Sequence, residues 1–425
     1  MSRSTILRLV LRACGIAVAA ALAAAPGMVW HSGVLAAQQT VAAAPNRCLL
    51  CHAQQREAAT VGVHADNGVQ CVDCHGGNAA ASELPAAHGN GFTGHVDKVA
   101  TARLCASCHS DPNRMRTYGL NTAELAEFRT SRHGQLLFEQ HDANAPTCTD
   151  CHGTHVIYPP YDARSKVYPT NIPSTCARCH ADTKLMAKYN LRTDQLTEFT
   201  ESAHGVALFQ KQDFAAPTCV SCHGAHSALP PARSELSTVC GNCHQLVATT
   251  FNTGPHGAAT RAGQLKGCLG CHTNHGTQRI PDDSIARTCD GCHAEDGRLH
   301  QTAVDLQHRM TQATLDLRSA NRALDRLTAT GQRTSDARFR YRSTLTDYLQ
   351  IAQVQHGLDL ERVEQLEGRV SAGSIELNRI ATSSEESRWE HKLILLPVWF
   401  LALSAAALAW LALAALRKDA GDGEP

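Results

Sequence analysis

The sequence predicts a mainly α-helical protein whose larger part has little regular secondary structure and precedes a long helical hairpin or coiled coil and one C-terminal transmembrane helix. Three observations support this prediction. A short cysteine and histidine motif recurs between Cys48 and His293. Apolar residues then repeat at alternating intervals of four and three. Finally, the 24 residues from Leu393 to Leu416 carry no charge.

The N-terminal residues have the order of a secretory signal. Arg3, Arg8 and Arg12 precede an alanine-rich apolar run over residues 13–30, and small residues near residues 34–36 offer a cleavage site. Residues 1–37 are therefore predicted to be a signal peptide or an N-terminal anchor. Cys14 precedes most of the apolar run, which makes it a poor lipoprotein cysteine.

The pattern Cys-x-x-Cys-His occurs nine times and uses 18 of the 19 cysteines. Two thiols at this spacing can bond to the two vinyl groups of one heme, and the adjacent histidine then becomes an axial ligand of the iron. Paired zinc motifs lack the systematic histidine, and a thioredoxin-like protein expects one motif. The sequence thus predicts nine covalently bound heme c groups. The attachment cysteines are Cys48, Cys51, Cys71, Cys74, Cys105, Cys108, Cys148, Cys151, Cys176, Cys179, Cys219, Cys222, Cys240, Cys243, Cys268, Cys271, Cys289 and Cys292, followed by the iron ligands His52, His75, His109, His152, His180, His223, His244, His272 and His293.

Over roughly residues 46–293 the chain resembles the multiheme c-type cytochromes with doubled Cys-x-x-Cys-His motifs. The resemblance implies export before heme attachment, which agrees with the N-terminal signal. Residues 38–294 are predicted to be one nonaheme domain, made of one heme site and four two-heme modules. The 246 residues from Cys48 to His293 leave about 27 for each heme. The hemes are therefore expected to form much of the core, with short helices after each motif.

Histidines outside the motifs recur within an internal repeat. The segment Leu-x-Glu-Phe-x-x-Ser-x-His-Gly ends at His133-Gly and returns 71 residues later. A further histidine follows some motifs by three residues, and we expect it to bind the heme of a neighbouring site. His141 aligns with Gln212 in the next repeat and is predicted to be a spare. The nine predicted second iron ligands are His64, His88, His95, His133, His155, His204, His226, His256 and His275.

Residues 295–391 are predicted to be helical. Apolar residues from Leu299 to Leu327 form a heptad stripe, and Gly331 interrupts it. A second helix is expected from about Asp336 to Ile380. An antiparallel hairpin is the simpler interpretation, and a dimerising or trimerising bundle is the alternative. The histidines of this segment, His300, His308 and His356, are not expected to bind heme.

Residues 393–416 are long enough to span a hydrocarbon core of about 30 Å as a helix. Arg388 and Lys392 flank one side, and Arg417 and Lys418 flank the other, so local charge does not orient the helix. The signal and the hemes place the heme domain in the periplasm, at the inner membrane of the cell, with residues 417–425 as a cytoplasmic tail.

Taken together, these features favour an electron carrier over a catalytic oxidoreductase, and no catalytic residue is predicted. Two axial histidines leave the iron no open position for a substrate. The expected partners are a quinol-oxidising complex in the membrane and a periplasmic or outer-membrane acceptor, such as a periplasmic cytochrome. A net charge of zero gives no argument for nucleic acid.

The alternative is a multiheme reductase acting on a small nitrogen or sulfur compound. Octaheme cytochromes of the hydroxylamine-oxidoreductase type also follow their hemes with long helices, but no motif here carries the lysine of pentaheme nitrite reductases. A quinol dehydrogenase is disfavoured, because there is a single membrane helix after the signal and it contains no histidine.

Overall fold

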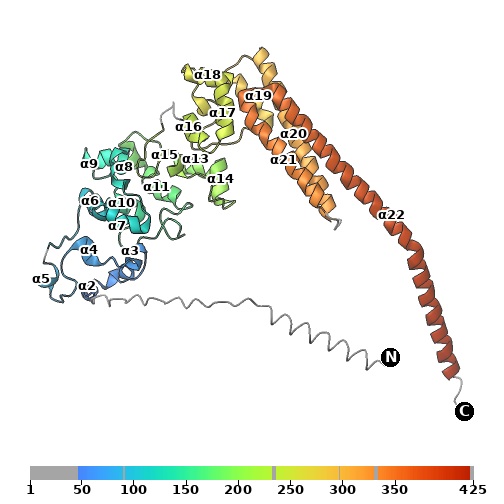
Figure 1. Ribbon diagram of the computed structural model, residues 1–425, viewed down its shortest axis with the longest axis horizontal. Helices are drawn as coiled ribbons and strands as arrows, with labels where there is room; N and C mark the ends of the chain where they lie inside the picture. Colours follow the sequence, from blue (N-terminus) through green and yellow to red (C-terminus); the bar gives the residue numbers. More distant parts are fainter. Residues whose placement is uncertain (1–45, 90, 232–235, 296, 330–333, 422–425) are drawn as a thin grey trace, which may run out of the picture. The chain divides into compact units, whose positions relative to one another are not determined.

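The computed structural model describes residues 46–89, 91–231, 236–295, 297–329 and 334–421 (Figure 1). Every regular element in these ranges is a helix, which confirms the mainly α prediction. The predicted signal over residues 1–37 lies outside them. The chain divides into a smaller unit, made of the residues up to Ala53 together with Gly76–Phe92, and a larger unit made of Gln54–His75 and Thr93–Pro425.

The smaller unit is a compact loop structure around the first motif. Its helices are α2 (Cys48–Cys51) and α5 (Leu84–Ala87). The Arg47 amide donates to the Ala79 carbonyl, and the Asn78 amide donates to the Ala87 carbonyl. Gly77 has a φ of 80°, and a Cβ atom there would overlap the Ala87 carbonyl. This close approach fixes the end of α5, where the chain continues into His88.

In the larger unit, short helices contain all of a motif or at least its first cysteine, rather than only following the motif. Thr147 and Thr218 begin two of these helices as the first residue of a capping box. Their amides donate to Asp150 Oδ2 at 2.8 Å and to Ser221 Oγ at 3.0 Å. The motif helices are α4 (Cys71–His75), α6 (Lys98–His109), α10 (Cys148–His152), α11 (Ile172–His180), α15 (Cys219–His223), α16 (Leu236–Gly241), η5 (Gly267–Gly270) and α19 (Ile285–Asp290).

The sequence repeat is also a structural repeat. Helices α8 (Glu124–Thr130) and α9 (Arg132–Phe138) correspond to α13 (Gln195–Glu201) and α14 (Ala203–Phe209). The buried hydroxyls of Ser131 and Ser202 accept from the amides of Gly134 and Gly205, at 2.9 and 3.0 Å. The remaining elements of this region are η1 (Ala53–Gln55), η2 (Glu57–Ala59), α3 (Val63–Asp66), α7 (Pro112–Met115), η3 (Arg116–Tyr118), α12 (Thr183–Ala187), α17 (Gln245–Thr253), α18 (Pro255–Arg261) and η6 (Asp282–Ser284).

The alignment of His141 with Gln212 is reproduced by the backbone. Both residues have left-handed φ values, 51° and 53°, immediately after the paired helices. They therefore occupy the same turn in successive repeats. A glutamine serves this turn as well as a histidine does, so the turn itself gives no reason for an imidazole.

The C-terminal part of the larger unit contains three helices instead of the predicted hairpin. They are α20 (Arg298–Ala329), α21 (Ser335–Val354) and α22 (Leu360–Gly421), and η7 (Gln355–Gly357) connects the last two. Helix α22 packs along both α20 and α21 (Figure 1). The predicted second helix is broken because Leu358 adopts a left-handed φ of 56°. Asp359 then caps α22 by accepting from the Arg362 amide at 3.0 Å.

The predicted apolar stripe of α20 supplies the core of these three helices. Leu306 and Met310 are buried against Ile351 of α21 and Leu366 of α22. Leu299, at the start of the predicted stripe, is 49% exposed. The apolar residues Leu345, Leu349 and Ala352 predict the core face of α21. The observed face lies one position away, because Tyr348 and Ile351 are buried whereas Leu349 is 51% exposed.

This packing predicts different effects for two leucine substitutions. Leu366→Ala removes a fully buried side chain and is expected to lower the free energy of opening the three helices by about 2–5 kcal/mol. Leu349→Ala changes an exposed residue and is expected to shift it by less than about 0.5 kcal/mol. Hydrogen exchange of residues 298–380 in the full chain measures both. Equal loss of protection in the two variants would contradict this register.

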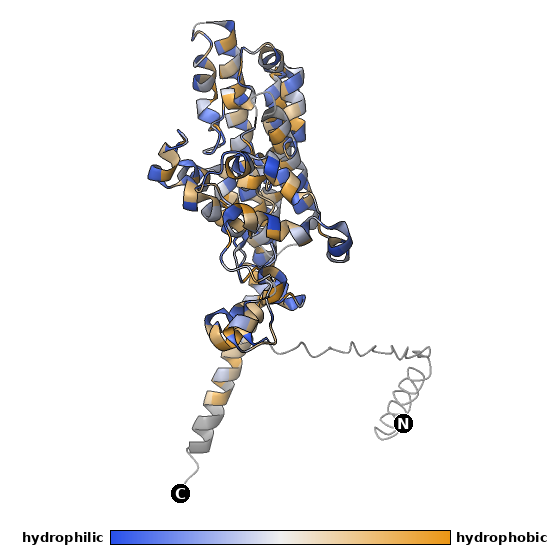
Figure 2. Ribbon diagram, turned by 90° about the vertical axis from the view of Figure 1, so that its left-hand side faces the viewer, coloured by the Kyte–Doolittle hydropathy of each residue, from blue (hydrophilic) through white to orange (hydrophobic). Residues whose placement is uncertain are grey.

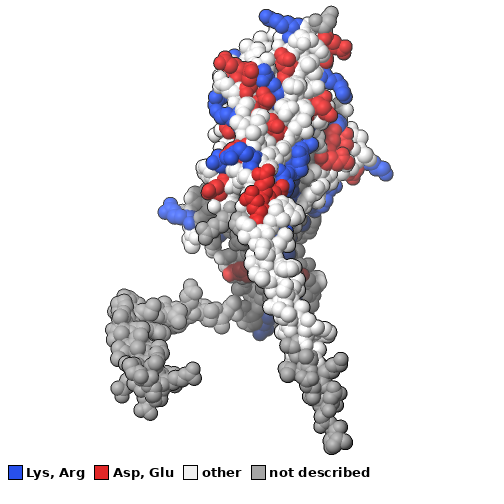
Figure 3. All heavy atoms as spheres, turned by 90° about the vertical axis from the view of Figure 1, so that its right-hand side faces the viewer, with Lys and Arg blue, Asp and Glu red and all other residues white. Residues whose placement is uncertain are grey.

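Helix α22 continues beyond the packed part as an apolar helix. It contains the one stretch among the described residues that is long and apolar enough to cross a membrane, and none of that stretch is buried in the protein (Figure 2). Charged side chains cover the helices above it and are missing from its surface (Figure 3). The predicted boundary between residues 391 and 393 is therefore a change in surface composition within one helix, with Pro397 inside it.

Candidate functional site: nine facing histidine pairs

Each motif histidine faces one second imidazole. We number the motifs as sites 1–9 in chain order. The ring centres of the nine pairs are 6.0–6.3 Å apart. In site order, the pairs are His52–His88, His75–His155, His109–His64, His152–His226, His180–His133, His223–His275, His244–His204, His272–His356 and His293–His256.

The spacing of these rings fits one metal ion held between them. Two metal–nitrogen bonds of about 2.0–2.1 Å, with about 1.1 Å from each nitrogen to its ring centre, give about 6.3 Å. A range of 0.3 Å across nine pairs is narrower than incidental ring contacts would give, because aromatic pairs spread over about 4.5–7 Å. The chemistry of the donor set also fits, since two imidazoles and two adjacent thiols are what a covalent heme requires.

Burial lowers the pKa of eight of these imidazoles, which favours their neutral form. Burial lowers the pKa of His133, and the facing His180 lowers it further. Burial and then His244 lower the pKa of His204 in the same way. Neutral imidazole is the form that binds metals, because protonation removes the lone pair. Burial is also the largest cause of lowered pKa values at His64, His152, His180, His256, His275 and His356.

Three motif histidines are oriented by a backbone carbonyl. His75 Nδ1 lies 3.0 Å from the Thr93 oxygen, and His223 Nδ1 lies 3.1 Å from the Leu229 oxygen. His272 Nδ1 makes the equivalent contact with Gln278 at 3.1 Å. An N–H donated from Nδ1 to a carbonyl leaves the lone pair on Nε2, the usual arrangement at metal-binding histidines.

The pairs follow a rule based on two-site modules. Modules 1–4 comprise sites 2–3, 4–5, 6–7 and 8–9. In each module, a leading histidine precedes the first site and faces the motif histidine of the second site. These leading histidines lie at the start of short helices and are His64 on α3, His133 on α9, His204 on α14 and His256 on α18.

The trailing histidines connect one module to the one before it. His155 follows site 4 and faces His75 of site 2. His226 follows site 6 and faces site 4, and His275 follows site 8 and faces site 6. Each trailing histidine therefore reaches the first site of the preceding module. We expected a neighbouring site, and the structure places it two sites back in the chain.

Carboxylates repeat beside the trailing histidines. Glu127 of α8 lies 3.9 Å from His226 Nδ1, and Glu198 of α13 lies 3.8 Å from His275 Nδ1. The two glutamates occupy the same position of the sequence repeat. A carboxylate near the outer ring nitrogen is a common partner of metal-binding histidines, where it increases the basicity of the ligand.

The thiols show that sites 2–9 are neighbours in chain order. Between modules, hydrogen bonds join Cys105 to Cys148, Cys176 to Cys219, and Cys240 to Cys268, and each bond raises the pKa of the first thiol of the pair. Within modules, burial raises the pKa of the second cysteine of the first site, and a nearby thiol of the second site raises it further. These pairs are Cys74–Cys108, Cys151–Cys176, Cys222–Cys243 and Cys271–Cys292.

One predicted second ligand does not join a pair. His95 is exposed, and no imidazole in the described ranges is recorded facing it. His356, which was not expected to bind heme, faces His272 of site 8 at 6.3 Å. The repeat contained a signal for this exchange. Each first site takes its partner from the following module, and module 4 has no successor.

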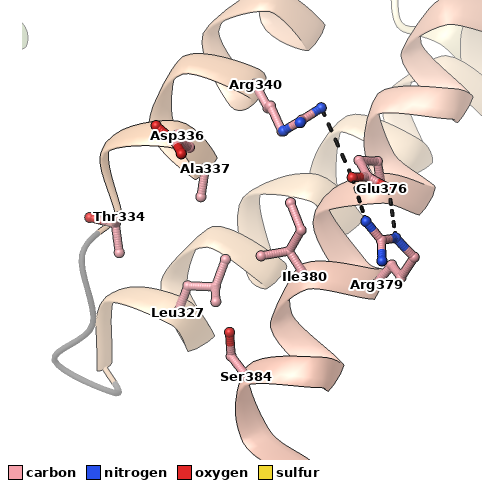
Figure 4. Close-up of a pocket in the computed structure, with 9 residues that line it drawn as sticks. All are labelled: Leu327, Thr334, Asp336, Ala337, Arg340, Glu376, Arg379, Ile380 and Ser384. Carbon is pink, nitrogen blue, oxygen red and sulfur yellow. Dashed lines mark hydrogen bonds and ion pairs between the residues drawn. The ribbon is translucent and has the colours of Figure 1, made fainter. Parts of the chain in front are cut away.

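The structure offers little else that could serve as a site. One pocket lies between the end of α20, the start of α21 and the facing part of α22 (Figure 4). In its lining, Glu376 forms ion pairs with Arg340 and Arg379. Its lining contains neither histidine nor cysteine. The described ranges contain no group of three or more histidine, cysteine or acidic side chains that could hold a metal ion. A pair of axial ligands consists of only two histidines, so it would not form such a group.

Comparisons with known proteins give no further assignment. No protein-family model matches the chain, and neither a curated protein nor a solved structure is significantly similar to it.

Proposed function

We propose that this protein is a nonaheme c-type cytochrome that transfers electrons and is anchored in a membrane by α22. One observation carries the proposal: all nine motif histidines face a second imidazole at a spacing that fits one iron. The motif cysteines would hold each heme covalently, and the paired histidines would bind its iron from both sides. The bound hemes supply reversible one-electron transfer at iron.

The completeness of the pairing favours a carrier over a reductase. A reductase acting on a nitrogen or sulfur compound needs one iron with a vacant position for its substrate. Here the protein provides two imidazoles at every site. Substrate would have to displace an axial histidine.

The contacts between neighbouring sites support a linear path. Thiol contacts connect site 2 to site 3 and continue without a gap to site 9. Neighbouring attachment points would bring successive hemes close together, so electrons would pass along sites 2–9 in chain order. Site 1 lies in the smaller unit and would be an additional member of the array.

The position of the array relative to the membrane follows from α22 and the signal. One exposed apolar helix supports a single-span anchor in the inner membrane, with the heme region in the periplasm and residues 417–425 in the cytoplasm. A membrane quinol-oxidising complex and a periplasmic or outer-membrane acceptor are the partners that this arrangement would connect.

Heme counting tests the proposal directly. A pyridine hemochrome assay of the matured protein is expected to give nine covalent hemes per chain. An EPR spectrum of the oxidised protein should contain only low-spin signals, because every iron has two imidazole ligands. Seven or fewer hemes would contradict the count. Nine hemes with a stoichiometric high-spin signal would instead favour the reductase.

A further inference from the structure

The pairing rule leaves one motif histidine, His272 of site 8, without a partner from the repeat. The first sites of modules 1, 2 and 3 face the trailing histidines of modules 2, 3 and 4. Module 4 is followed by α20 instead of another module. Its first-site histidine, His272, would therefore have no partner if the repeat alone supplied the second imidazoles.

His356 occupies that position. It lies in η7, the single turn between α21 and α22, and its ring centre is 6.3 Å from that of His272 with the planes 28° apart. These values match the pairs His223–His275 and His256–His293, which have interplanar angles of 20° and 22°. The geometry at site 8 is therefore the same as at sites where the repeat supplies both rings.

The turn that carries His356 is held against the heme region. The Thr250 hydroxyl of α17 donates to the Gln353 carbonyl at 2.9 Å. Gly254 and Gly357 approach so closely that a Cβ atom on Gly254 would lie 2.9 Å from the Gly357 oxygen. Helix α17 begins directly after the site 7 motif, so these contacts fix His356 relative to sites 7 and 8.

The His356 ring lies where η7 contacts the heme region, facing His272. Its Nδ1 atom is buried beside the backbone of Ala352 and Gln353, and it forms no hydrogen bond of ordinary geometry with the described residues. The other two histidines of the segment are not candidates for site 8. His300 is engaged with Asp290 at 2.8 Å, and His308 is exposed on α20.

We propose that His356 is the second axial ligand of the site 8 heme, so that the three-helix segment completes the last module as a following module would. The proposal rests on the nonaheme function proposed above. It also makes α22 a direct continuation of a heme ligand, because the helix begins four residues after His356 and runs on into the apolar stretch. Site 8 would thus be tied by one short turn to the membrane anchor.

The test is His356→Ala in the full chain, with His308→Ala as the matched control. His356→Ala is expected to retain nine covalent hemes, since the motif thiols are unchanged. About one heme in nine should become high-spin, bind one equivalent of carbon monoxide and return to low spin when imidazole is added. His308→Ala should remain fully low-spin and bind no carbon monoxide.

A second variant, His356→Met, tests the same assignment if His356→Ala fails to fold. His356→Met is expected to keep site 8 six-coordinate, to show a sulfur-to-iron charge-transfer band and to raise the potential of one heme. A wholly low-spin His356→Ala without carbon monoxide binding would overturn the assignment. If His356→Ala failed to mature, absence of the methionine band in His356→Met would overturn it as well. Failure of the nonaheme proposal is distinct, because the unaltered protein would then lack nine hemes.

Discussion

A chain that ends at Lys392 is expected to leave washed membranes while retaining nine covalent hemes. The deletion of Leu393–Pro425 removes the apolar stretch of α22, none of which is buried against the described residues. The packed part of α22, from Val363 to Ala381, stays in place. Since each leucine at the centre of a membrane helix contributes about 0.3–0.6 kcal/mol to insertion, losing the whole stretch should abolish anchoring.

The control for this deletion is a chain that lacks only Arg417–Pro425, which should remain in the membrane. Fractionation followed by heme staining of denaturing gels measures both chains. A shortened protein that is soluble and fully loaded would agree with a single C-terminal anchor. A shortened protein that stays in washed membranes would show that residues 1–37 act as an uncleaved anchor.

Replacing His226 with alanine is expected to remove the second axial ligand from the iron of site 4, although His226 follows the site 6 motif. His226 faces His152 at 6.1 Å, with the ring planes 25° apart. His204→Ala is expected to open site 7, within its own module, because His204 faces His244. Each variant should keep nine hemes, show about one high-spin heme in nine and bind one equivalent of carbon monoxide.

A second set of variants identifies which iron has opened. In a chain with Cys148→Ala and Cys151→Ala, site 4 holds no heme, so adding His226→Ala should give no further carbon monoxide binding. Adding His204→Ala to the same chain should still give one equivalent. His141→Ala is the control that changes neither spin state nor binding. Additional carbon monoxide binding by His226→Ala in the chain without site 4 would refute pairing between modules.

The sequence was most informative where a motif has fixed chemistry or a repeat aligns two copies. The sequence could single out His133 and His204, which the structure places opposite motif histidines, because the same segment occurs twice. His95 was chosen from the degenerate first module, where no second copy was available to test the choice. The repeat implies that His272 needs a partner from outside the modules, but only the tertiary contact of η7 with α17 identifies His356, 84 residues later, as the facing imidazole.

The helical segment shows a different limit of sequence patterns. The stripe of α20 placed Leu306, Met310 and Ala313 correctly in the core, because a long amphipathic helix repeats its signal many times. The break at Leu358 lacks such a signal, since one left-handed residue between two apolar helices leaves the periodicity nearly intact. The shifted face of α21 has a similar cause, because Tyr348 and Thr344 are buried polar residues that a count of apolar positions misses.

The trailing histidines determine where a two-site module could be added to the proposed array or removed from it. A duplicate of module 2, 3 or 4 inserted beside the original would bring one leading and one trailing histidine. Its trailing histidine would serve the preceding module, the trailing histidine of the next module would serve its own first site, and every proposed iron would still have two imidazoles. A module added after site 9 would provide a second imidazole for site 8 and displace His356, and its own first site would then need a new partner. Loss of the last module would likewise leave site 6 one imidazole short. In the proposed array, a change in heme number would therefore be easiest between existing modules, and the segment that supplies His356 would set the C-terminal boundary.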